Sequence, residues 1–466
     1  AYEIPLRLVG SERCIRDSNK GFVAFLTLGC KVNTYETNAM QLLFRQAGYT
    51  VVEFADKADI YIVNTCSVTN MADRKSRQML HKAKKKNPDA IIVAAGCYVQ
   101  AAKEQLEQDT AVDVVVGNNQ KNRIVEIVEA YRQNHQECSF IVDVAKDSVY
   151  ECMHIEDAGE RTRACIKIQD GCNQFCSYCI IPYTRGRVRS RAEEDILAEI
   201  TNLVKQGYKE FVINGIHLSS YGADEQNKDF VRLAGKPLLH VLEKINAIDG
   251  VERIRLGSLE PRVITEEFVS KLVQLEKICP HFHLSLQSGC DETLKRMNRK
   301  YSTKEFLDGC IILRKYYENP AITTDVIVGF PMETEEEFQQ TYQFLERIAF
   351  SQMHIFKYSV RKGTRAEKMT PQVGENIKTE RSNKLLQLNH RLQKKYEETF
   401  LSKEEKVLFE EVTTIEDKEY VIGHNERYLK IAVPATEKEA DDFINTIQKV
   451  KIENILDTNV LLGKIG

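Results

Sequence analysis

The sequence lacks the features that mark membrane-spanning and secreted proteins. None of its apolar runs approaches 18 residues, so no transmembrane helix is predicted. The first 20 residues have no apolar core of the kind found in secretory signals, and we treat residues 1–20 as an N-terminal extension. The 13 cysteines show no disulfide-like regularity, which indicates a reducing compartment. We therefore expect a cytoplasmic protein without membrane contact.

Length and composition indicate a multidomain globular protein. A chain of 466 residues is too long for one ordinary domain, so two to four domains are expected. The apolar fraction of 42% is enough for each domain to bury a core. The net charge of -3 does not identify a partner, so the local arrangement of residues must carry any functional argument.

Three cysteines stand close together near the middle of the chain. Cys172, Cys176 and Cys179 have the spacing C-x3-C-x2-C, in a polar segment that argues against purely structural, buried cysteines. Three thiols cannot all pair as disulfides, and thiolate is the usual ligand of iron–sulfur clusters and of zinc. Zinc sites close with four ligands, and this loop contains no histidine, so zinc is the weaker interpretation. A [4Fe–4S] cluster held by three cysteines leaves one iron open for another ligand.

A second set of three cysteines follows the strands of a predicted parallel sheet. Residues 21–135 alternate apolar runs with helical patterns, which is typical of a doubly wound, Rossmann-like sheet. Cys30, Cys66 and Cys97 each come after one predicted strand, and the carboxyl ends of such strands share one edge. Chance placement is the alternative to a second three-cysteine cluster site. The predicted strands are 22–27, 60–63, 91–94 and 112–116, and the predicted helices are 34–47, 69–86 and 99–107.

Residues 136–160 are predicted to be a polar linker, and residues 161–388 a second parallel α/β domain. Six strand candidates separated by helices predict a partial (β/α)6 barrel, with its functional residues at the carboxyl ends of the strands. The strand candidates are 164–168, 211–213, 253–256, 283–286, 323–328 and 354–358. The helices predicted between them include 193–206, 264–275, 303–316 and 335–348. Several strand ends carry small or polar residues that can admit a nucleoside. The resulting cofactor-binding candidates are Tyr178, Gly215, Ser258, Gln287, Ser288 and Gly329.

The last part of the chain, residues 389–466, begins within a long helix and then changes character. Short alternating apolar runs predict a small antiparallel β-barrel, a scaffold that often binds RNA. Four arginines are candidates for RNA phosphate contacts. They are Arg185, Arg187 and Arg189, for which stabilisation of the nearby cysteine loop is the alternative, and Arg427 in the barrel.

Together these parts resemble the radical S-adenosylmethionine (SAM) methylthiotransferase family. Its members combine an N-terminal methylthiotransferase domain, a radical SAM core and a C-terminal TRAM domain. The resemblance rests on LGCKVN at 28–33, NTC at 64–66, GC at 96–97, GCNQFCSYC at 171–179 and PYTRG at 182–186. The GCKVN variant is similar to the branch that converts N6-threonylcarbamoyladenosine, beside the anticodon of tRNA, to its 2-methylthio form. Other branches more often read GCQMN or GCPKN.

The resemblance implies a chemistry for both cysteine sets. Cys172, Cys176 and Cys179 would hold the radical-generating [4Fe–4S] cluster, which binds SAM and yields a 5′-deoxyadenosyl radical on reduction. That radical would take hydrogen from C2 of the adenine. Cys30, Cys66 and Cys97 would hold an auxiliary [4Fe–4S] cluster, from which sulfur methylated by a second SAM is delivered. No catalytic side chain beyond these ligands is predicted.

The resemblance also implies partners. We expect the tRNA anticodon stem-loop as substrate, an electron donor such as flavodoxin or ferredoxin, and a monomeric enzyme. The same chemistry on N6-isopentenyladenosine of tRNA, or on a ribosomal-protein aspartate, is the alternative within the family. An iron–sulfur or zinc protein that binds RNA without catalysis is the alternative from another class.

Overall fold

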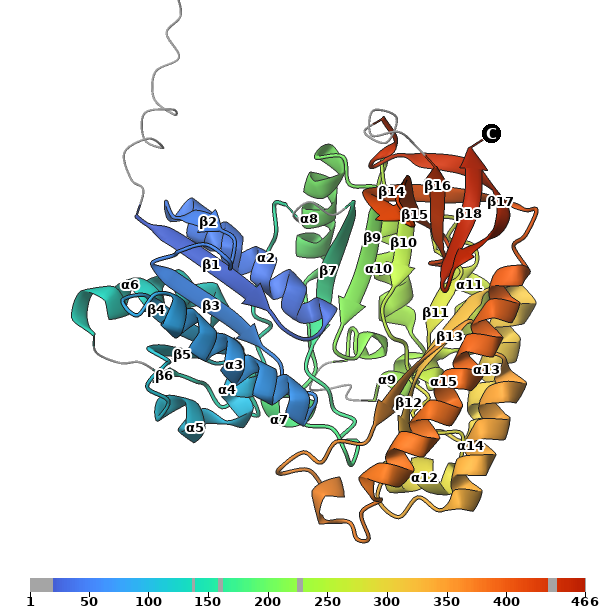
Figure 1. Cartoon of the computed structure of the whole chain (residues 1–466), viewed down its shortest axis with the longest axis horizontal. Helices are drawn as coiled ribbons and strands as arrows, with labels where there is room; N and C mark the ends of the chain where they lie inside the picture. Colours follow the sequence, from blue (N-terminus) through green and yellow to red (C-terminus); the bar gives the residue numbers. More distant parts are fainter. Residues whose placement is uncertain (1–19, 136–138, 158–161, 224–228, 435–441, 466) are drawn as a thin grey trace, which may run out of the picture. The chain divides into compact units, whose positions relative to one another are not determined.

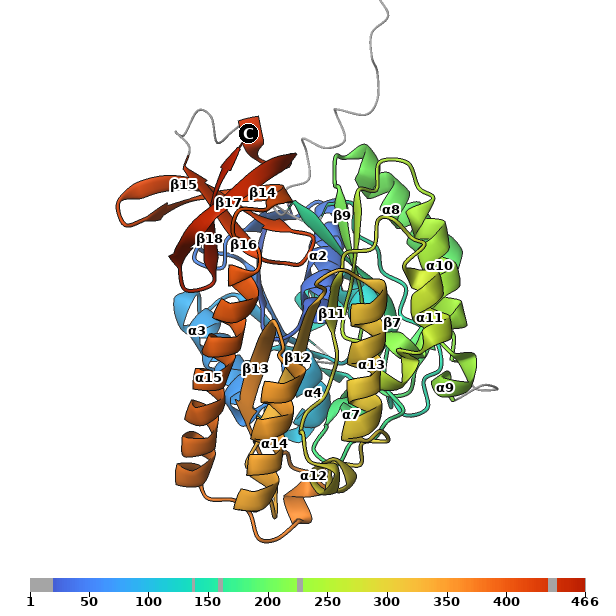
Figure 2. The same ribbon diagram turned by 90° about the vertical axis from the view of Figure 1, so that its right-hand side faces the viewer.

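The computed structural model describes residues 20–135, 139–157, 162–223, 229–434 and 442–465 (Figures 1 and 2). The expected extension at 1–20 lies outside the described residues, apart from Lys20. The described chain forms two compact units. The N-terminal unit contains residues 20–157 together with Tyr183–Arg185, and the C-terminal unit contains residues 162–182 and 186–465. The boundaries at 135 and 388 remain predictions.

The N-terminal unit is built on a six-stranded sheet whose strands are all parallel, in the order β2-β1-β3-β4-β5-β6. The strands are β1 (Phe22–Thr27), β2 (Thr50–Val52), β3 (Ile60–Thr65), β4 (Ile91–Gly96), β5 (Val114–Val116) and β6 (Ser139–Phe140). The helices are α2 (Lys31–Gln46), α3 (Asn70–Lys86), α4 (Cys97–Ala101), α5 (Lys103–Glu107) and α6 (Ile124–Asn134). The expected parallel α/β architecture is therefore present.

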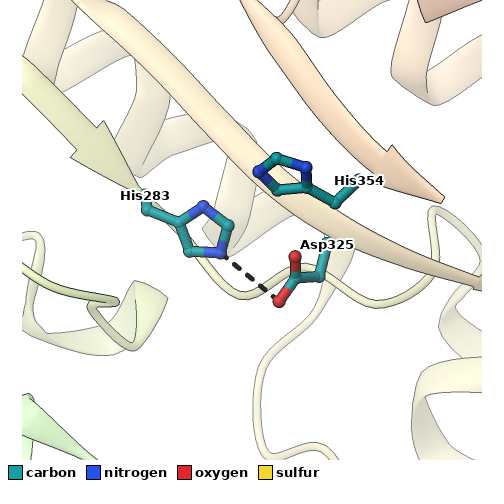
Figure 3. A group of neighbouring side chains, drawn as sticks. All are labelled: His283, Asp325 and His354. Carbon is teal, nitrogen blue, oxygen red and sulfur yellow. Dashed lines mark ion pairs between the residues drawn. The ribbon is translucent and has the colours of Figure 1, made fainter. Parts of the chain in front are cut away.

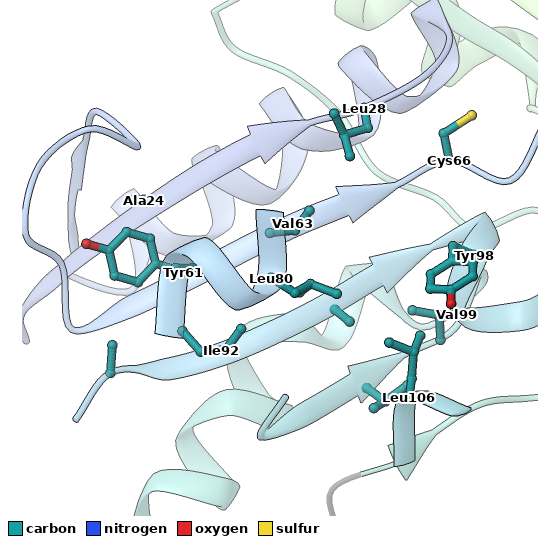
Figure 4. Packing of buried hydrophobic residues seen from close by; sticks show 14 of the residues in the cluster. Ala24, Leu28, Tyr61, Val63, Cys66, Leu80, Ile92, Tyr98, Val99 and Leu106 are labelled. Atoms are coloured by element: carbon teal, nitrogen blue, oxygen red, sulfur yellow. The ribbon is translucent and has the colours of Figure 1, made fainter. Parts of the chain in front are cut away.

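Helices cover both faces of this sheet, which is why its strands are apolar along their whole length. On one face, Leu80 of α3 and Leu106 of α5 pack with Tyr61, Val63 and Ile92 of the strands (Figure 4). On the other face, residues of α2 and α6 pack on alternate strand residues. They are Met40, Phe44, Ile124, Ile127 and Val128, against Val23, Phe25, Ile60, Ile62 and Val93.

Three elements of this unit are absent from the sequence prediction: strands β2 and β6 and the 11-residue helix α6. The two strands have only three and two residues, which is too few for an alternating pattern. The helix predicted over 99–107 is two helices, because Ala102 has φ -135 and ψ 40. Such a backbone conformation is not helical, and the chain changes direction there.

The C-terminal unit begins with strands of two parallel sheets. The first has the order β10-β9-β7-β8, with only the edge strand β8 antiparallel, and the second has the order β11-β12-β13. Isolated bridges such as Leu259↔Leu284 join the β10 and β11 regions. The strands are β7 (Arg163–Asp170), β8 (Arg189–Ser190), β9 (Glu210–Gly215), β10 (Arg253–Leu256), β11 (His281–His283), β12 (Ala321–Val328) and β13 (Gln352–Lys357).

Helices line the outer side of these strands (Figure 2). They are α8 (Glu193–Lys205), α10 (Lys236–Asn246), α11 (Glu266–Leu272), α13 (Thr303–Tyr316), α14 (Glu335–Ile348) and α15 (Glu375–Glu398). Three short helices, α7 (Ile181–Thr184), α9 (Phe230–Leu233) and α12 (Asp291–Arg296), lie in the connections that follow β7, β9 and β11. Helices α13 and α14 begin where the sequence predicts, because Ser302 and Thr334 each form a capping box with a glutamate three residues later. The strand predicted at 283–286 is wrong, since β11 ends at His283.

The end of the chain forms five further strands: β14 (Glu404–Ile415), β15 (Lys418–Asn425), β16 (Lys430–Pro434), β17 (Ile447–Asp457) and β18 (Val460–Ile465). Their order, β14-β15-β16-β18-β17, closes through a pairing of β17 with β14. The strands enclose a small core that includes Phe400, Val407 and Ile431. Four pairings are antiparallel as expected, but β16 pairs with β18 in parallel.

No helix in the described part of the chain is both long enough and apolar enough to span a lipid bilayer.

Candidate metal centres

The loop after β7 carries the first three cysteines. Gly171 starts this loop with φ +70, and a Cβ on it would lie 1.8 Å from the carbonyl oxygen of Arg187, so only glycine fits. The Cys172 N–H donates to the carbonyl of Gly186 at 3.1 Å. The Cys179 N–H donates to the carbonyl of Cys176 at 3.0 Å, which closes a turn between these two cysteines. The backbone is therefore shaped so that the loop turns back on itself.

The three thiols of this loop share one environment. Burial raises the pKa of Cys172 to about 12, and it raises the pKa of Cys179 further, with the charge of Cys176 contributing to both shifts. Each of these thiols therefore lies within electrostatic reach of the others. Cys172 and Cys179 therefore stay protonated without a metal, and binding of a soft cation replaces their protons.

A guanidinium group faces this site. Nη1 of Arg299 lies 3.2 Å from Sγ of Cys176 and donates to it. The same side chain donates to the carbonyl of Ser285 at 3.0 Å and, through Nε, to the hydroxyl of Tyr301 at 2.8 Å. No spacing rule in the sequence singles out Arg299, which lies 123 residues from Cys176.

Hydrogen bonds connect the cysteine loop to the segment after α12. Ser177 donates from its N–H to the carbonyl of Met297 at 2.9 Å and from its hydroxyl to the carbonyl of Arg296 at 2.8 Å. Asn298 donates to the carbonyl of Phe175 at 2.9 Å. The predicted cofactor contact Tyr178 packs edge-on against Phe330, with ring centroids 6.4 Å apart.

The other predicted cofactor contacts fall into two groups. Gly215, the exposed Ser258 and the buried Gln287 lie at the ends of, or just beyond, β9, β10 and β11. The Ser288 hydroxyl is instead buried 3.2 Å from the hydroxyl of Thr341 on α14, and it accepts the Cys290 N–H. Gly329 turns with φ +70 against the side chain of Lys378. These last two positions therefore support local packing, and the expectation of a cofactor contact from the Ser288 hydroxyl is corrected.

His217, just beyond β9, is a further polar group near this end of the strands. Its Nδ1 lies 2.7 Å from the Ser220 hydroxyl, and its ring packs edge-on against Phe230. Burial, together with the charges of Arg299 and Arg262, lowers the pKa of His217 to about 3. The imidazole is therefore neutral at physiological pH, and its Nε2 has no hydrogen-bond partner among the described residues.

Three neighbouring strands also present a histidine–aspartate–histidine group (Figure 3). His283 of β11, Asp325 of β12 and His354 of β13 have ligand atoms within 4.8 Å of one another. Nε2 of His283 lies 3.4 Å from the Asp325 carboxylate, and Nδ1 of His283 lies 2.9 Å from the Thr323 hydroxyl. These contacts account for both nitrogens of His283 without a metal, so we assign no ion to the group.

In the N-terminal unit each of the other three cysteines follows a strand, as the sequence predicts. Cys66 and Cys97 come directly after β3 and β4, and Cys30 lies three residues beyond the end of β1. Gly29, with φ +105, brings the first of these turns against Cys66, since a Cβ on it would lie 2.8 Å from the Cys66 Sγ. Asn33 joins two turns by donating to the carbonyls of Leu28 at 2.7 Å and Thr65 at 3.0 Å. The first two turns are thereby held together, and the third follows β4, which neighbours β3 at the same edge of the sheet.

The three thiols at this edge also influence one another. Burial raises the pKa of Cys66 to about 11 and raises the pKa of Cys30, and the charge of Cys97 contributes to both shifts. Cys30 is in addition the N-cap of the 16-residue helix α2, where a helix favours negative charge. Three soft donors at the end of a parallel sheet fit an iron–sulfur cluster, and again one iron is left for another ligand.

Arg185 lies in this site rather than on the RNA-facing surface predicted for it. Its side chain is 0% exposed. Nε donates to Sγ of Cys97 at 3.2 Å, Nη1 donates to Glu36 at 2.8 Å and Nη2 donates to Asn33 at 2.7 Å. A guanidinium with all three nitrogens on protein partners is not presented to a phosphate, so the expected RNA contact of Arg185 is corrected.

The remaining arginines differ in exposure. The side chain of Arg189 is 1% exposed and lies 3.9 Å from Asp170, so it is not accessible to a phosphate and that expectation is corrected. Arg187 is exposed, with its guanidinium over the ring of Phe175. Arg427 donates to the carbonyls of Glu318 and Asn319 at 2.9 Å each, which attaches the β15–β16 connection to the rest of the C-terminal unit. Arg187 is thus the candidate best placed to meet a phosphate.

Known proteins resemble this chain in sequence over nearly its whole length. Residues 22–117 match the family described as "Uncharacterized protein family UPF0004", and residues 166–345 match the "Radical SAM superfamily". Threonylcarbamoyladenosine tRNA methylthiotransferase MtaB of Bacillus subtilis is 41% identical over 92% of this chain and 93% of that protein. MtaB of Aquifex aeolicus is 39% identical over 88% and 98%.

Two further comparisons concern another branch of the family and a solved structure. A tRNA-2-methylthio-N(6)-dimethylallyladenosine synthase of Clostridium botulinum is 33% identical over 90% of this chain and 92% of that protein. The radical SAM methyltransferase TsrM of Kitasatospora setae, solved with cobalamin and a [4Fe–4S] cluster, has a TM-score of 0.52 at 12% identity over 72% of each chain, a likeness of fold alone.

The regions that carry the two cysteine sets therefore both have relatives, and the cofactors follow from them. SAM and two [4Fe–4S] clusters are the cofactors of such a protein. The two family matches, at 22–117 and 166–345, extend over both cysteine sets. This chain belongs to the radical SAM methylthiotransferase family, in its MtaB group.

Proposed function

We propose that this enzyme converts N6-threonylcarbamoyladenosine beside the anticodon of tRNA to its 2-methylthio derivative. The observation that carries the proposal is the identity of 36–41% to four MtaB proteins over most of the chain. The GCKVN variant around Cys30 supports the same branch.

Within this proposal, Cys172, Cys176 and Cys179 hold the cluster that binds SAM, and Cys30, Cys66 and Cys97 hold the auxiliary cluster. When bound and reduced, the first cluster with SAM supplies a 5′-deoxyadenosyl radical, and the auxiliary cluster supplies the sulfur. The chain itself binds these groups, orients them and keeps water away. Arg299 fixes Cys176 by a hydrogen bond to its sulfur, and Ser177 and Asn298 hold the loop that carries the ligands.

The remaining parts of the proposal concern the partners. Adenosine beside an anticodon lies in a loop whose bases can be splayed out, which is the form in which RNA sequence is read. The strands β14–β18 are proposed to be a TRAM domain in a small barrel, and Arg187 to contact phosphate. The enzyme is proposed to act as a cytoplasmic monomer that receives electrons from a flavodoxin or ferredoxin.

The test is nucleoside mass spectrometry. Anaerobically reconstituted protein, SAM and a reductant are incubated with tRNA that carries threonylcarbamoyladenosine without the methylthio group. We expect a new 2-methylthio nucleoside and 5′-deoxyadenosine. If 5′-deoxyadenosine forms without that product, the substrate assignment is wrong, and isopentenyl-tRNA and ribosomal protein are the next substrates to try. If neither forms with both clusters intact and reduced, the enzymatic assignment fails.

A further inference from the structure

Arg185 is distinguished by where its three nitrogens point. In the N-terminal unit its guanidinium and the Glu36 carboxylate are both buried, with side-chain exposures of 0% and 1%. Nη1 and Nη2 donate to Glu36 and Asn33, and Nε is directed at the Cys97 sulfur at 3.2 Å. The carboxylate therefore fixes the plane of the guanidinium so that one N–H points at one sulfur.

The position of Glu36 is fixed in turn. The ammonium of Lys121, also 0% exposed, donates to Glu36 Oε2 at 2.5 Å and to the Asn118 side chain at 2.7 Å. Asn118 donates to the carbonyl of Thr184, the residue before Arg185, at 2.7 Å. Its amide also lies 3.7 Å from the Cys97 sulfur. Cys97 thus faces two side-chain donors held by one connected polar network.

Hydrogen bonding to the Cys97 sulfur bears on the reduction potential of a cluster bound there. Hydrogen bonds to cluster sulfurs and the net charge around a cluster set its reduction potential. A positive donor on a cysteine sulfur withdraws electron density from the iron it binds and favours the reduced, more negative cluster. We propose that Arg185 is a positioning residue that raises the reduction potential of the auxiliary cluster through Cys97. This rests on the ligand assignment made under the proposed function.

The effect of Arg185 can be measured on the auxiliary cluster alone, because the other cysteine set can be removed by substitution. Replacing Cys172, Cys176 and Cys179 with alanine in the full-length chain leaves only the auxiliary set. In that background we compare Arg185→Gln and Arg185→Lys with Arg187→Gln. The last variant removes an exposed cation two residues away and serves as the matched control. Each protein is reconstituted anaerobically, its iron is counted, and the potential is measured by redox titration followed by electron paramagnetic resonance.

We expect about four iron atoms per chain in all four proteins, as a [4Fe–4S] cluster requires. We expect a more negative midpoint potential for Arg185→Gln, a smaller shift for Arg185→Lys, which keeps the charge, and no shift for Arg187→Gln. An unchanged potential in Arg185→Gln with full iron overturns this inference and leaves the proposed function standing.

Two further outcomes also overturn it. Loss of the cluster from both Arg185 variants, with their circular dichroism unchanged, would mean that the guanidinium serves assembly rather than tuning. Absence of any cluster from the triple-alanine background itself would contradict the assignment of Cys30, Cys66 and Cys97, and with it both the inference and that part of the proposed function.

Discussion

Arg299 donates a hydrogen bond from Nη1 to Sγ of Cys176 across 3.2 Å, although the two residues are 123 positions apart. Arg185 makes the same kind of contact with Cys97 in the other unit, also at 3.2 Å. Each cysteine set therefore has one arginine directed at one of its sulfurs. Hydrogen bonds that involve a charged group are about twice as strong as neutral ones, so both contacts should have measurable effects.

Replacement of Arg299 should slow the cleavage of SAM. Arg299→Gln removes the charge beside Cys176, and a hydrogen bond to a charged group is worth about 1.5–3 kcal/mol, which corresponds to a rate effect of roughly 10- to 150-fold. The measurement is the rate of 5′-deoxyadenosine formation at saturating reductant. Lys300→Gln, which removes the adjacent exposed cation, is the control and should behave like wild type. A wild-type rate for Arg299→Gln would show that the contact has no role in the reaction.

Single substitutions should distinguish the functions of the two cysteine sets. Cys172→Ala should abolish 5′-deoxyadenosine formation, because the radical-generating cluster loses a ligand. Cys97→Ala should retain 5′-deoxyadenosine formation but yield no 2-methylthio nucleoside. Cys310→Ala is the control, since this cysteine is buried in α13. Methylthio product from Cys97→Ala, detected by nucleoside mass spectrometry, would contradict the auxiliary assignment.

Removal of the Glu36 charge should destabilise the N-terminal unit. Glu36→Gln leaves Arg185 and Lys121 buried without their shared carboxylate, and breaking a buried ion pair on one side costs about 3–5 kcal/mol. The free energy of unfolding of the cluster-free protein in urea measures this. Glu126→Gln breaks the exposed pair with Arg123 and should leave stability unchanged. Equal stabilities of the two variants would mean that the network is not maintained in solution.

His217 should make folding sensitive to acid. Burial holds its folded pKa at about 3, below the ordinary value of 6.5, so the unfolded chain binds the proton more readily. The resulting stability is fully present above pH 6.5 and is lost progressively as pH falls toward 3. Between pH 7 and pH 5, wild type should lose up to about 2 kcal/mol more than His217→Gln. Urea unfolding at both pH values tests this, and equal losses would refute it.

Arg187 should contribute to tRNA affinity through one phosphate. Arg187→Gln should weaken binding uniformly across tRNA sequences and lower the slope of log affinity against log salt by about 1. Arg347→Gln, an exposed arginine on α14, is the control and should leave the slope unchanged. Filter binding or fluorescence anisotropy at several salt concentrations gives the slopes. A slope equal to wild type for Arg187→Gln would exclude the phosphate contact.

Local patterns in the sequence were sufficient for several of the longer elements. Strands β1 and β10 and helices α13 and α14 have the predicted bounds, because apolar periodicity and capping boxes act within a few residues. The placement of Cys30, Cys66 and Cys97 after parallel strands followed from βα alternation alone, since that alternation forces the carboxyl ends of the strands to one edge.

The roles of single charged side chains could not be read in the same way. Arg185 and Arg187 stand two residues apart in an identical basic context, yet one is fully buried and the other is exposed. Ser288 resembles a binding residue in sequence, but its hydroxyl meets Thr341, 53 residues away. Sequence spacing and strand order predict which sulfurs bind the clusters, because ligand chemistry depends on residue type and position. Only the tertiary structure decided which cations face those sulfurs, because burial and partners come from segments far apart in the chain.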